Sequence, residues 1–260
     1  MLVLRPGALG DTLLAVPALR ALHRKFGPLR LAAHLGAARL LASVGEVEEG
    51  LAFDDPSLAW LFVRPPSSEA IVAWMNSNGV PGLEDALLVA PSRPAGLQHC
   101  ALYLLETLAP LGVDTSFLDD HPLNVHPISS NEVLIHPGSG SPAKNWPPAQ
   151  FAETIRALDR PVRLIVGEAD SAAALAVEAC LSYSLPRLSN VPLEELAARL
   201  AGCHAYLGND SGVSHLAGLC GARSVVLFGP TSPVVWRPLG PGVQVRPFET
   251  LSTEIANLLA

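Results

Sequence analysis

The chain has 260 residues, which is enough for two compact domains. Apolar residues make up 49% of it and charged residues 16%, so the sequence can bury a large core. The 17 Lys and Arg against 24 Asp and Glu give a net charge of −7, and no basic run occurs. This composition argues against a nucleic-acid-binding protein and against attachment to an anionic membrane through basic clusters.

The sequence shows no targeting or metal-binding pattern. The apolar run after Met1 is too short for a signal peptide, and no stretch of about 20 apolar residues could span a bilayer. The four cysteines have no C-x-x-C spacing, so we expect buried, reduced thiols. We therefore expect a cytoplasmic protein without a metal.

Short apolar runs alternate with amphipathic patterns along the chain, as in parallel βαβ units. In the first half, these patterns predict strands over 2–4, 31–33, 51–53, 70–73 and 87–90, and helices over 9–25 and 97–108. In the second half, they predict strands over 133–135, 162–166, 205–207 and 224–228, and helices over 147–158, 171–180, 193–201, 211–220 and 249–259.

The segment 112–131 contains aspartates and prolines with little periodicity, so it is the best candidate for a linker. We predict a domain over 1–125, a second domain over 126–245 and a C-terminal helix over 246–260. Two doubly wound α/β halves of this kind would leave a cleft at the carboxyl ends of both sheets.

A glycine turn follows the first predicted strand, in R-P-G-A-L-G-D. Gly7 and Gly10 would let the backbone turn tightly and approach a ligand. Asp11 would then lie near the N-terminus of the following helix. An ordinary turn with an N-capping aspartate is the alternative interpretation.

A second loop, H-P-G-S-G-S-P-A-K-N-W-P over 136–147, follows the first strand of the second half. Ser139, Gly140 and Ser141 would expose backbone amides, and Lys144 would add a positive charge, as in a phosphate-binding loop. A flexible turn with a solvated Lys144 is the alternative, and His136 could equally have a structural role.

A third loop, G-N-D-S-G-V-S-H over 208–215, again joins a strand to a helix. Ser211 and Gly212 would place free amides of the first helical turn over an anion. Asp210 would cap the helix, and His215 would face the same cleft one turn later. Thr231, in F-G-P-T-S-P, could line the same pocket. An ordinary N-cap before an amphipathic helix is the alternative.

These segments, with the opening L-V-L-R-P-G-A-L-G-D-T-L-L, resemble the ADP-heptose:lipopolysaccharide heptosyltransferases, glycosyltransferase family 9. The resemblance implies a GT-B fold, in which two Rossmann-like domains face a central cleft. It also implies inverting, metal-independent transfer of heptose from an ADP-linked sugar to a cell-envelope glycolipid or polysaccharide, without a cofactor. The lack of an Asp-x-Asp motif agrees with metal independence.

The resemblance also implies roles for single residues. Asp11 would be the general base, and Lys144 would neutralise the leaving diphosphate with the help of Ser139 and Ser141. Glu168 and Asp170 lie in G-E-A-D-S, where relatives often carry an acidic residue near the ribose. The diphosphate side of the site would consist of Asp210, Ser211, Gly212 and His215.

The chain departs from the family pattern between residues 54 and 93, where the usual strand end and basic acceptor loops are missing. Two alternatives therefore stay open: a non-catalytic sugar-nucleotide-binding protein with a trimmed acceptor domain, and a sugar-nucleotide epimerase. A dinucleotide-dependent oxidoreductase is disfavoured, because no G-x-G-x-x-G follows the first strand. We expect a monomer whose partners are the sugar nucleotide and a glycolipid or polysaccharide acceptor at the inner membrane face, with no nucleic acid.

Overall fold

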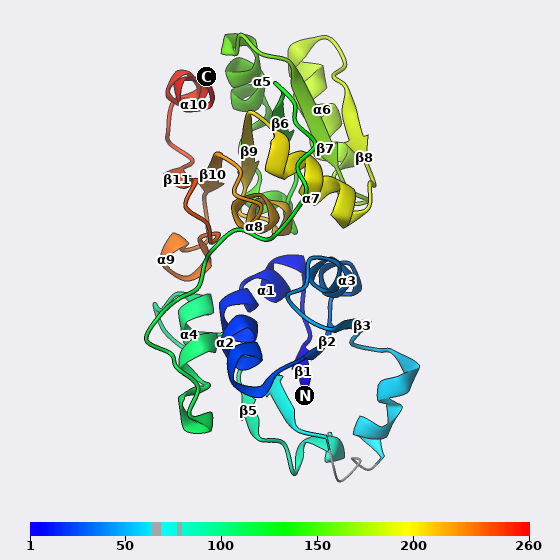
Figure 1. Cartoon of the computed structure of the whole chain (residues 1–260). Coiled ribbons are helices and arrows are strands. Elements are labelled where there is room, and N and C mark those ends of the chain that lie inside the picture. The colour runs from blue at the N-terminus through cyan, green and yellow to red at the C-terminus, as the bar shows by residue number, and fades with distance from the viewer. Residues whose placement is uncertain (64–68, 77–79) are drawn as a thin grey trace. The chain divides into compact units, whose positions relative to one another are not determined.

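The computed structural model describes residues 1–63, 69–76 and 80–260. The chain forms two compact units, Met1–Asp120 and His121–Ala260, each of which is described by itself (Figure 1). The stretch between Leu111 and Val133 contains no helix or strand, and the boundary between the units lies within it. Over the described ranges, every helix is too short or too polar to cross a membrane.

The N-terminal unit is built on a parallel sheet with the strand order β3-β2-β1-β4-β5. Its strands are β1 (Leu2–Arg5), β2 (Arg30–Ala33), β3 (Glu49–Ala52), β4 (Ile71–Trp74) and β5 (Leu88–Ala90). Its helices are α1 (Leu9–Leu13), α2 (Val16–Phe26), α3 (Leu35–Ser43) and α4 (Cys100–Glu106), with the 3-10 segments η1 (Pro56–Phe62), η2 (Pro81–Leu83) and η3 (Ala109–Leu111).

The two sides of this sheet are covered differently. Leu2 and Leu4 of β1 pack against leucines of η1 and η2, and α2 packs against α4. Short apolar runs were predicted here as strands, and parallel strands buried on both faces have this composition. Between residues 54 and 93, the helical structure of the described part consists of the 3-10 segments η1 and η2, which accompany strands β4 and β5.

Two predicted helices of this unit are wrong in their bounds. The helix over 9–25 is broken into α1 and α2, because Pro17 has no N–H to donate to the carbonyl of Leu13. The helix over 97–108 is shortened to α4, since Leu97 is 79% exposed and gains no burial from a helical turn. Helix α3, which was not predicted, begins at Leu35 and is capped by His34, whose Nδ1 accepts the Ala37 amide at 3.3 Å.

The C-terminal unit is built on a parallel sheet with the strand order β11-β10-β9-β6-β7-β8. Its strands are β6 (Val133–His136), β7 (Val162–Val166), β8 (Arg187–Ser189), β9 (Ala205–Asn209), β10 (Ser224–Phe228) and β11 (Val243–Pro247). Its helical segments are η4 (Pro142–Lys144), α5 (Pro148–Ala157), α6 (Ser171–Leu181), α7 (Leu193–Gly202), α8 (Gly212–Leu219), α9 (Pro233–Trp236) and α10 (Ser252–Leu259).

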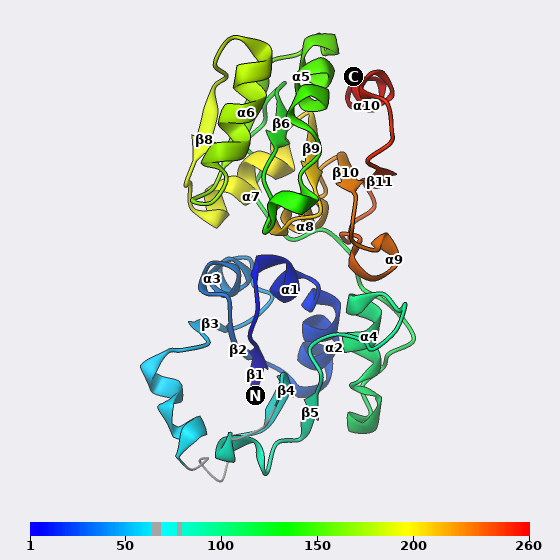
Figure 2. The ribbon, with the colours of Figure 1, turned by 180° about the vertical axis from the view of Figure 1, so that it is seen from behind.

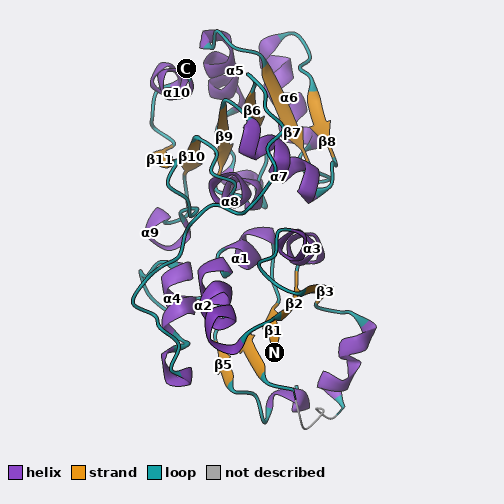
Figure 3. Cartoon of the chain, in the orientation of Figure 1, coloured by secondary structure: helices purple, strands orange, loops and turns teal. Residues whose placement is uncertain are grey.

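Helices cover both faces of this second sheet. Helix α5 packs against α6 and α10, whereas α7 packs against α8 (Figures 2 and 3). Trp146 and Phe151 lie in the core beside α5, with their rings edge to face and the centroids 5.2 Å apart. Counted within the unit, the strand order is that of the doubly wound Rossmann fold. The prediction of two doubly wound parallel-sheet domains is therefore confirmed.

Candidate functional site

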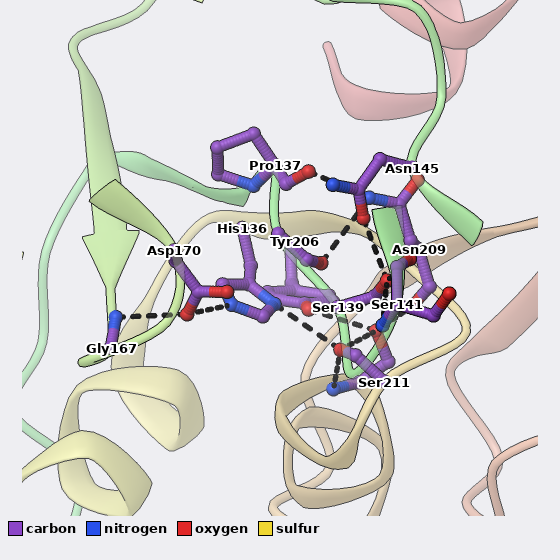
Figure 4. A network of polar contacts seen from close by, with 12 residues as sticks. His136, Pro137, Ser139, Ser141, Asn145, Gly167, Asp170, Tyr206, Asn209 and Ser211 are labelled. Carbon is purple, nitrogen blue, oxygen red and sulfur yellow. Dashed lines mark hydrogen bonds and ion pairs between the residues drawn. The ribbon is translucent and has the colours of Figure 1, made fainter. Parts of the chain in front are cut away.

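A buried polar network lies at the carboxyl ends of β6 and β9, the two central neighbouring strands of the C-terminal unit (Figure 4). The chain leaves β6 toward β7 on one side, and β9 continues toward β10 on the other. This arrangement is a topological switch point, where open α/β sheets bind their ligands. His136 is the last residue of β6, and Asn209 is the last residue of β9.

His136 is the centre of this network and is 3% exposed. Its Nδ1 lies 3.2 Å from Ser211 Oγ, and its Nε2 lies 2.9 Å from Asp170 Oδ2. The same carboxylate oxygen accepts the Gly167 amide at 2.9 Å. His136 therefore has the structural role that the sequence left open, because both of its ring nitrogens have hydrogen-bond partners.

Asp170 is buried next to this imidazole. Burial raises the pKa of its carboxyl group, but the hydrogen bond and charge of His136 and the Gly167 amide outweigh that effect, so the pKa lies below its ordinary value. Gly138 makes the arrangement possible: a Cβ at this position would lie 1.9 Å from Asp170 Oδ1.

The loop after β6 is fixed by its own polar groups. Asn209 Nδ2 donates to the Pro137 carbonyl at 2.9 Å, and its Oδ1 accepts the Trp146 amide at 2.9 Å. Ser139 Oγ lies 2.6 Å from both the Ser141 carbonyl oxygen and Asn145 Oδ1, so its hydrogen is used inside the loop. The loop is therefore a preformed surface rather than a flexible turn.

Lys144 is tied to the following strand-to-helix junction. Its Nζ lies 3.1 Å from Asp210 Oδ2, and Thr231 Oγ1 donates to the same oxygen at 2.7 Å. The Lys144 side chain is 26% exposed and the Asp210 side chain 7%. The alternative of a merely solvated Lys144 is excluded by this ion pair.

The predicted cap of α8 is wrong by one residue. Ser211, not Asp210, is the N-cap, and its Oγ accepts the Ser214 amide at 3.4 Å. Asp210 instead faces Lys144 and Thr231. The Ser214 amide of the first helical turn is thus bonded to Ser211, and Gly212 in the same turn is partly exposed.

A pocket of 420 Å³ adjoins the loop after β6 and extends between the starts of α5 and α6. Trp146 and Phe151 line it together with small alanines of α6, and Gly140, Ser139 and Asp170 supply polar edges. A mainly apolar cavity of this size with a few polar groups is typical of small-molecule sites.

Asp11 lies in the N-terminal unit, at the third position of α1. Its Oδ2 accepts the Ala8 amide at 2.9 Å, and its Oδ1 lies 3.5 Å from Arg5 Nη2. The Asp11 side chain is 35% exposed, whereas Arg5 is 1% exposed. Gly7 has a φ of 146°, and a Cβ there would lie 2.9 Å from Asp11 Oδ2, so this loop requires glycine. Gly10 is buried inside α1.

The structure brings together some of the predicted site residues and not others. Glu168 is exposed in the turn after β7, two positions before Asp170, and His215 is buried within α8. The predicted residues that share the junction of the loop after β6 with the start of α8 are Ser139, Gly140, Ser141, Lys144, Asp210, Ser211, Gly212 and Thr231. Gly7, Gly10 and Asp11 belong to the N-terminal unit.

Asn145 and Asn209 were not predicted as site residues, although they hold this junction together. Their positions could have identified them, because Asn209 is the last residue of a buried strand and Asn145 lies in the polar loop that follows another. Within the described ranges, no group of three or more His, Cys, Asp or Glu side chains is placed to hold a metal ion.

Comparison with known proteins gives consistent matches. Residues 106–250, more than half of the chain, match the profile of glycosyltransferase family 9 (heptosyltransferase). Lipooligosaccharide heptosyltransferase 2 of Haemophilus influenzae is 27% identical over 172 residues, which are 63% of this chain and 44% of that protein. Lipopolysaccharide heptosyltransferase 1 of Pseudomonas aeruginosa is 35% identical over 136 residues, which are 50% of this chain and 36% of that protein. The match thus spans less than half the length of either relative.

The solved structure of E. coli heptosyltransferase WaaC with ADP is similar in fold. It has a TM-score of 0.75 and 17% identity, with 98% of this chain and 97% of that chain covered. Together with the two parallel sheets, this likeness confirms the predicted GT-B fold.

Proposed function

Because the chain belongs to glycosyltransferase family 9, we propose that it transfers heptose from an ADP-linked sugar to a cell-envelope glycolipid or polysaccharide. The observation that carries the proposal is the junction of Lys144 with the start of α8, beside a 420 Å³ pocket at the switch point of the second sheet. The choice of ADP is supported by the solved heptosyltransferase of like fold, whose structure was determined with ADP.

Lys144 is suited to bind the diphosphate of the donor. An ammonium group has three hydrogens, and the Asp210 carboxylate occupies one, which leaves the others for phosphate oxygens. Asp210 and Thr231 thereby orient the lysine. The amides of Gly212 and its neighbour at the start of α8 would add donors and the positive end of the helix dipole. The donor nucleoside would then occupy the adjoining pocket, with Glu168 near its ribose.

Asp11 is suited to act as the general base. A carboxylate has about four lone-pair positions, and the contacts with Ala8 and Arg5 use two, so one oxygen can still accept the proton of an acceptor hydroxyl. That hydroxyl oxygen would form the bond to the anomeric carbon while the bond to the diphosphate breaks on the opposite face, which inverts the configuration. Negative charge then grows on the leaving diphosphate, where Lys144 would stabilise it without a metal.

The test is nucleotide release from ADP-heptose in the presence of bacterial glycolipid extract. Asp11→Asn should reduce transfer by about 10²–10⁴-fold with nucleotide binding retained, whereas Lys144→Ala should weaken both. Lys25→Ala is the matched control, since Lys25 lies on α2 and donates to the Gly112 carbonyl. Near-normal turnover by Asp11→Asn would contradict the assigned base. Binding without any turnover would favour a non-catalytic binding protein, and conversion of the free sugar nucleotide without acceptor would favour an epimerase.

A further inference from the structure

A buried arginine, Arg5, ends β1, the middle strand of the sheet in the N-terminal unit (Figure 1). Its exposed fraction is 1%. Its Nη1 donates to the Pro6 carbonyl at 3.3 Å, and its Nη2 lies 3.5 Å from Asp11 Oδ1. The Nε hydrogen has no acceptor among the residues that the structure describes. These contacts replace only part of the hydration that a guanidinium loses when it is buried.

This arrangement is poorly suited to stabilise the fold. The other residues of β1 are apolar and fully buried. Replacement of a buried ion pair by apolar side chains of similar volume is often neutral or stabilising, and a buried donor without an acceptor adds a further cost. A buried unsatisfied group in a folded protein therefore needs an explanation other than stability. The contact with Asp11 supplies one.

Asp11 is the anion that pairs with Arg5. The thiol of Cys100, at the start of α4, also lies near the guanidinium, and burial raises the pKa of this thiol to about 11. The thiol is therefore uncharged at neutral pH. Burial lowers the pKa of Arg5, but arginine side chains stay protonated in proteins, so a full positive charge faces the Asp11 carboxylate.

The two oxygens of Asp11 are held by different groups. The Ala8 amide donates to Oδ2 at 2.9 Å, and Arg5 approaches Oδ1. A carboxylate that is held at one oxygen can still turn about its Cβ–Cγ bond, because this torsion has broad energy wells. A second contact on the other oxygen, from a side chain that is itself fixed by burial, restricts that rotation. The Asp11 side chain, which is 35% exposed, thus keeps a constant orientation toward a ligand.

We propose that Arg5 is a positioning residue for the transfer reaction and holds the Asp11 carboxylate in the orientation that accepts the proton of the acceptor hydroxyl. The inference rests on the proposed function, because it assumes that Asp11 is the base. Arg5 is too deeply buried to touch the acceptor, so it acts through Asp11 and keeps its own hydrogens during the step. Proton transfer requires an approach of about 2.6–3.2 Å between the heavy atoms, and a misplacement of about 1 Å can cost about 10²-fold in rate.

The experiment measures nucleotide release from ADP-heptose with bacterial glycolipid extract, at saturating ADP-heptose. Arg5→Met should lower turnover by about 10²-fold and leave the KM for ADP-heptose unchanged, because the proposed donor site belongs to the other unit. Arg5→Lys keeps the charge but lacks the fork that reaches both the Pro6 carbonyl and Asp11, so its turnover should lie between those of Arg5→Met and wild type. Arg30→Met is the matched control. Arg30 begins β2 and pairs with Glu49 and Glu69, so its loss should leave turnover at the wild-type value.

A double-mutant cycle separates positioning from a purely structural role. In a chain that already carries Asp11→Asn, a positioning role predicts that Arg5→Met changes the residual turnover little, since the base is already lost. A structural role would lower turnover by the same factor in both chains. Circular dichroism checks the folding of each variant, and Arg5→Lys takes the place of Arg5→Met in the cycle if the latter does not fold.

The outcomes distinguish this inference from the proposed function. Wild-type turnover in the folded Arg5 variants, or equal factors with and without Asp11→Asn, would overturn the positioning role and leave Asp11 as the base. Near-normal turnover by Asp11→Asn, or no transfer by wild-type protein, would instead overturn the proposed function and the inference together.

Discussion

Gly138→Ala tests the packing beneath the loop after β6. Its new methyl group would lie 1.9 Å from Asp170 Oδ1 and 2.4 Å from Asp170 Cγ, so either the loop or the carboxylate must move. Overpacking in a tight interior costs about 1–3 kcal/mol, and a lost hydrogen bond to a charged group costs about 1.5–3 kcal/mol. Because the loop and the carboxylate would each move in part, both costs contribute in part, and we expect the free energy of unfolding to fall by about 2–4 kcal/mol.

The assay is urea unfolding followed by circular dichroism, with hydrogen exchange of the peptide over 133–146 to localise the change. A loss of this size lowers the midpoint by roughly 1–2 M at a slope of about 2 kcal/mol/M. Gly96→Ala is the matched control, because its Cβ meets nothing within 4 Å, and it should change stability by less than about 0.5 kcal/mol.

A double substitution identifies the cause. If the new methyl group clashes with Asp170, Gly138→Ala should lower the free energy of unfolding only slightly in a chain that already carries Asp170→Ala, because the clashing carboxylate is absent there. Equal midpoints for Gly138→Ala and Gly96→Ala would refute the reasoning. Full additivity of the two changes would also refute it, because the loss would then have a source other than the contact between these two residues.

Three further predictions concern charge, backbone and thiols. The pKa of Asp170 is lowered in the folded state. Its ionised carboxylate therefore stabilises the fold above the ordinary pKa of about 4, and this stabilisation is lost as pH falls through the lower pKa of the folded state. The free energy of unfolding should consequently depend less on pH in Asp170→Asn than in wild type, as measured by acid unfolding. Gly27→Ala should lower the free energy of unfolding only by the strain of a positive φ, about 1–2 kcal/mol. Gly240→Ala should lower it more, because its Cβ would also lie 2.1 Å from the Gly218 carbonyl oxygen, and thermal unfolding of both variants measures the difference. A thiol reagent at pH 8 should label Cys180 first, since it is exposed and burial raises the pKa of the other three cysteines to about 11 or 12; Cys180→Ser should abolish the fast phase.

The central strands were predictable because each is mainly apolar. The predicted bounds of β7 and β10, 162–166 and 224–228, are those of the structure. The edge strands β8 and β11 were missed, since R-L-S and V-Q-V-R-P contain polar residues and have no apolar run. An edge strand is held by pairing with one neighbour, and such pairing leaves no periodic signal in the sequence.

The sequence predicted which polar loops form the site but not which side chains in them contact one another. Glycines, hydroxyls and Lys144 after the strands mark the edge of the sheet where ligands bind. The partner of Lys144 lies 66 positions away at Asp210, and that of His136 lies 34 positions away at Asp170. Only the strand order brings such residues together, and the sequence does not state that order. The misplaced cap at Asp210 has a simpler cause, a one-residue error in where α8 begins.

Helix caps and functional groups need not be alternatives at this kind of site. Ala8, not Asp11, is the N-cap of α1, and Asp11 at the third helical position accepts the Ala8 amide through one oxygen while keeping lone pairs for an acceptor hydroxyl. Asp11→Asn would keep an oxygen for the Ala8 amide but would lose the charge that makes the group a base. Stability and catalysis should therefore separate. A side-chain acceptor at a helix N-terminus is worth about 1 kcal/mol, and Asp11→Asn would keep it. We expect this variant to unfold close to wild type while transfer falls by orders of magnitude. If both fell together, Asp11 would serve mainly as a structural group of α1.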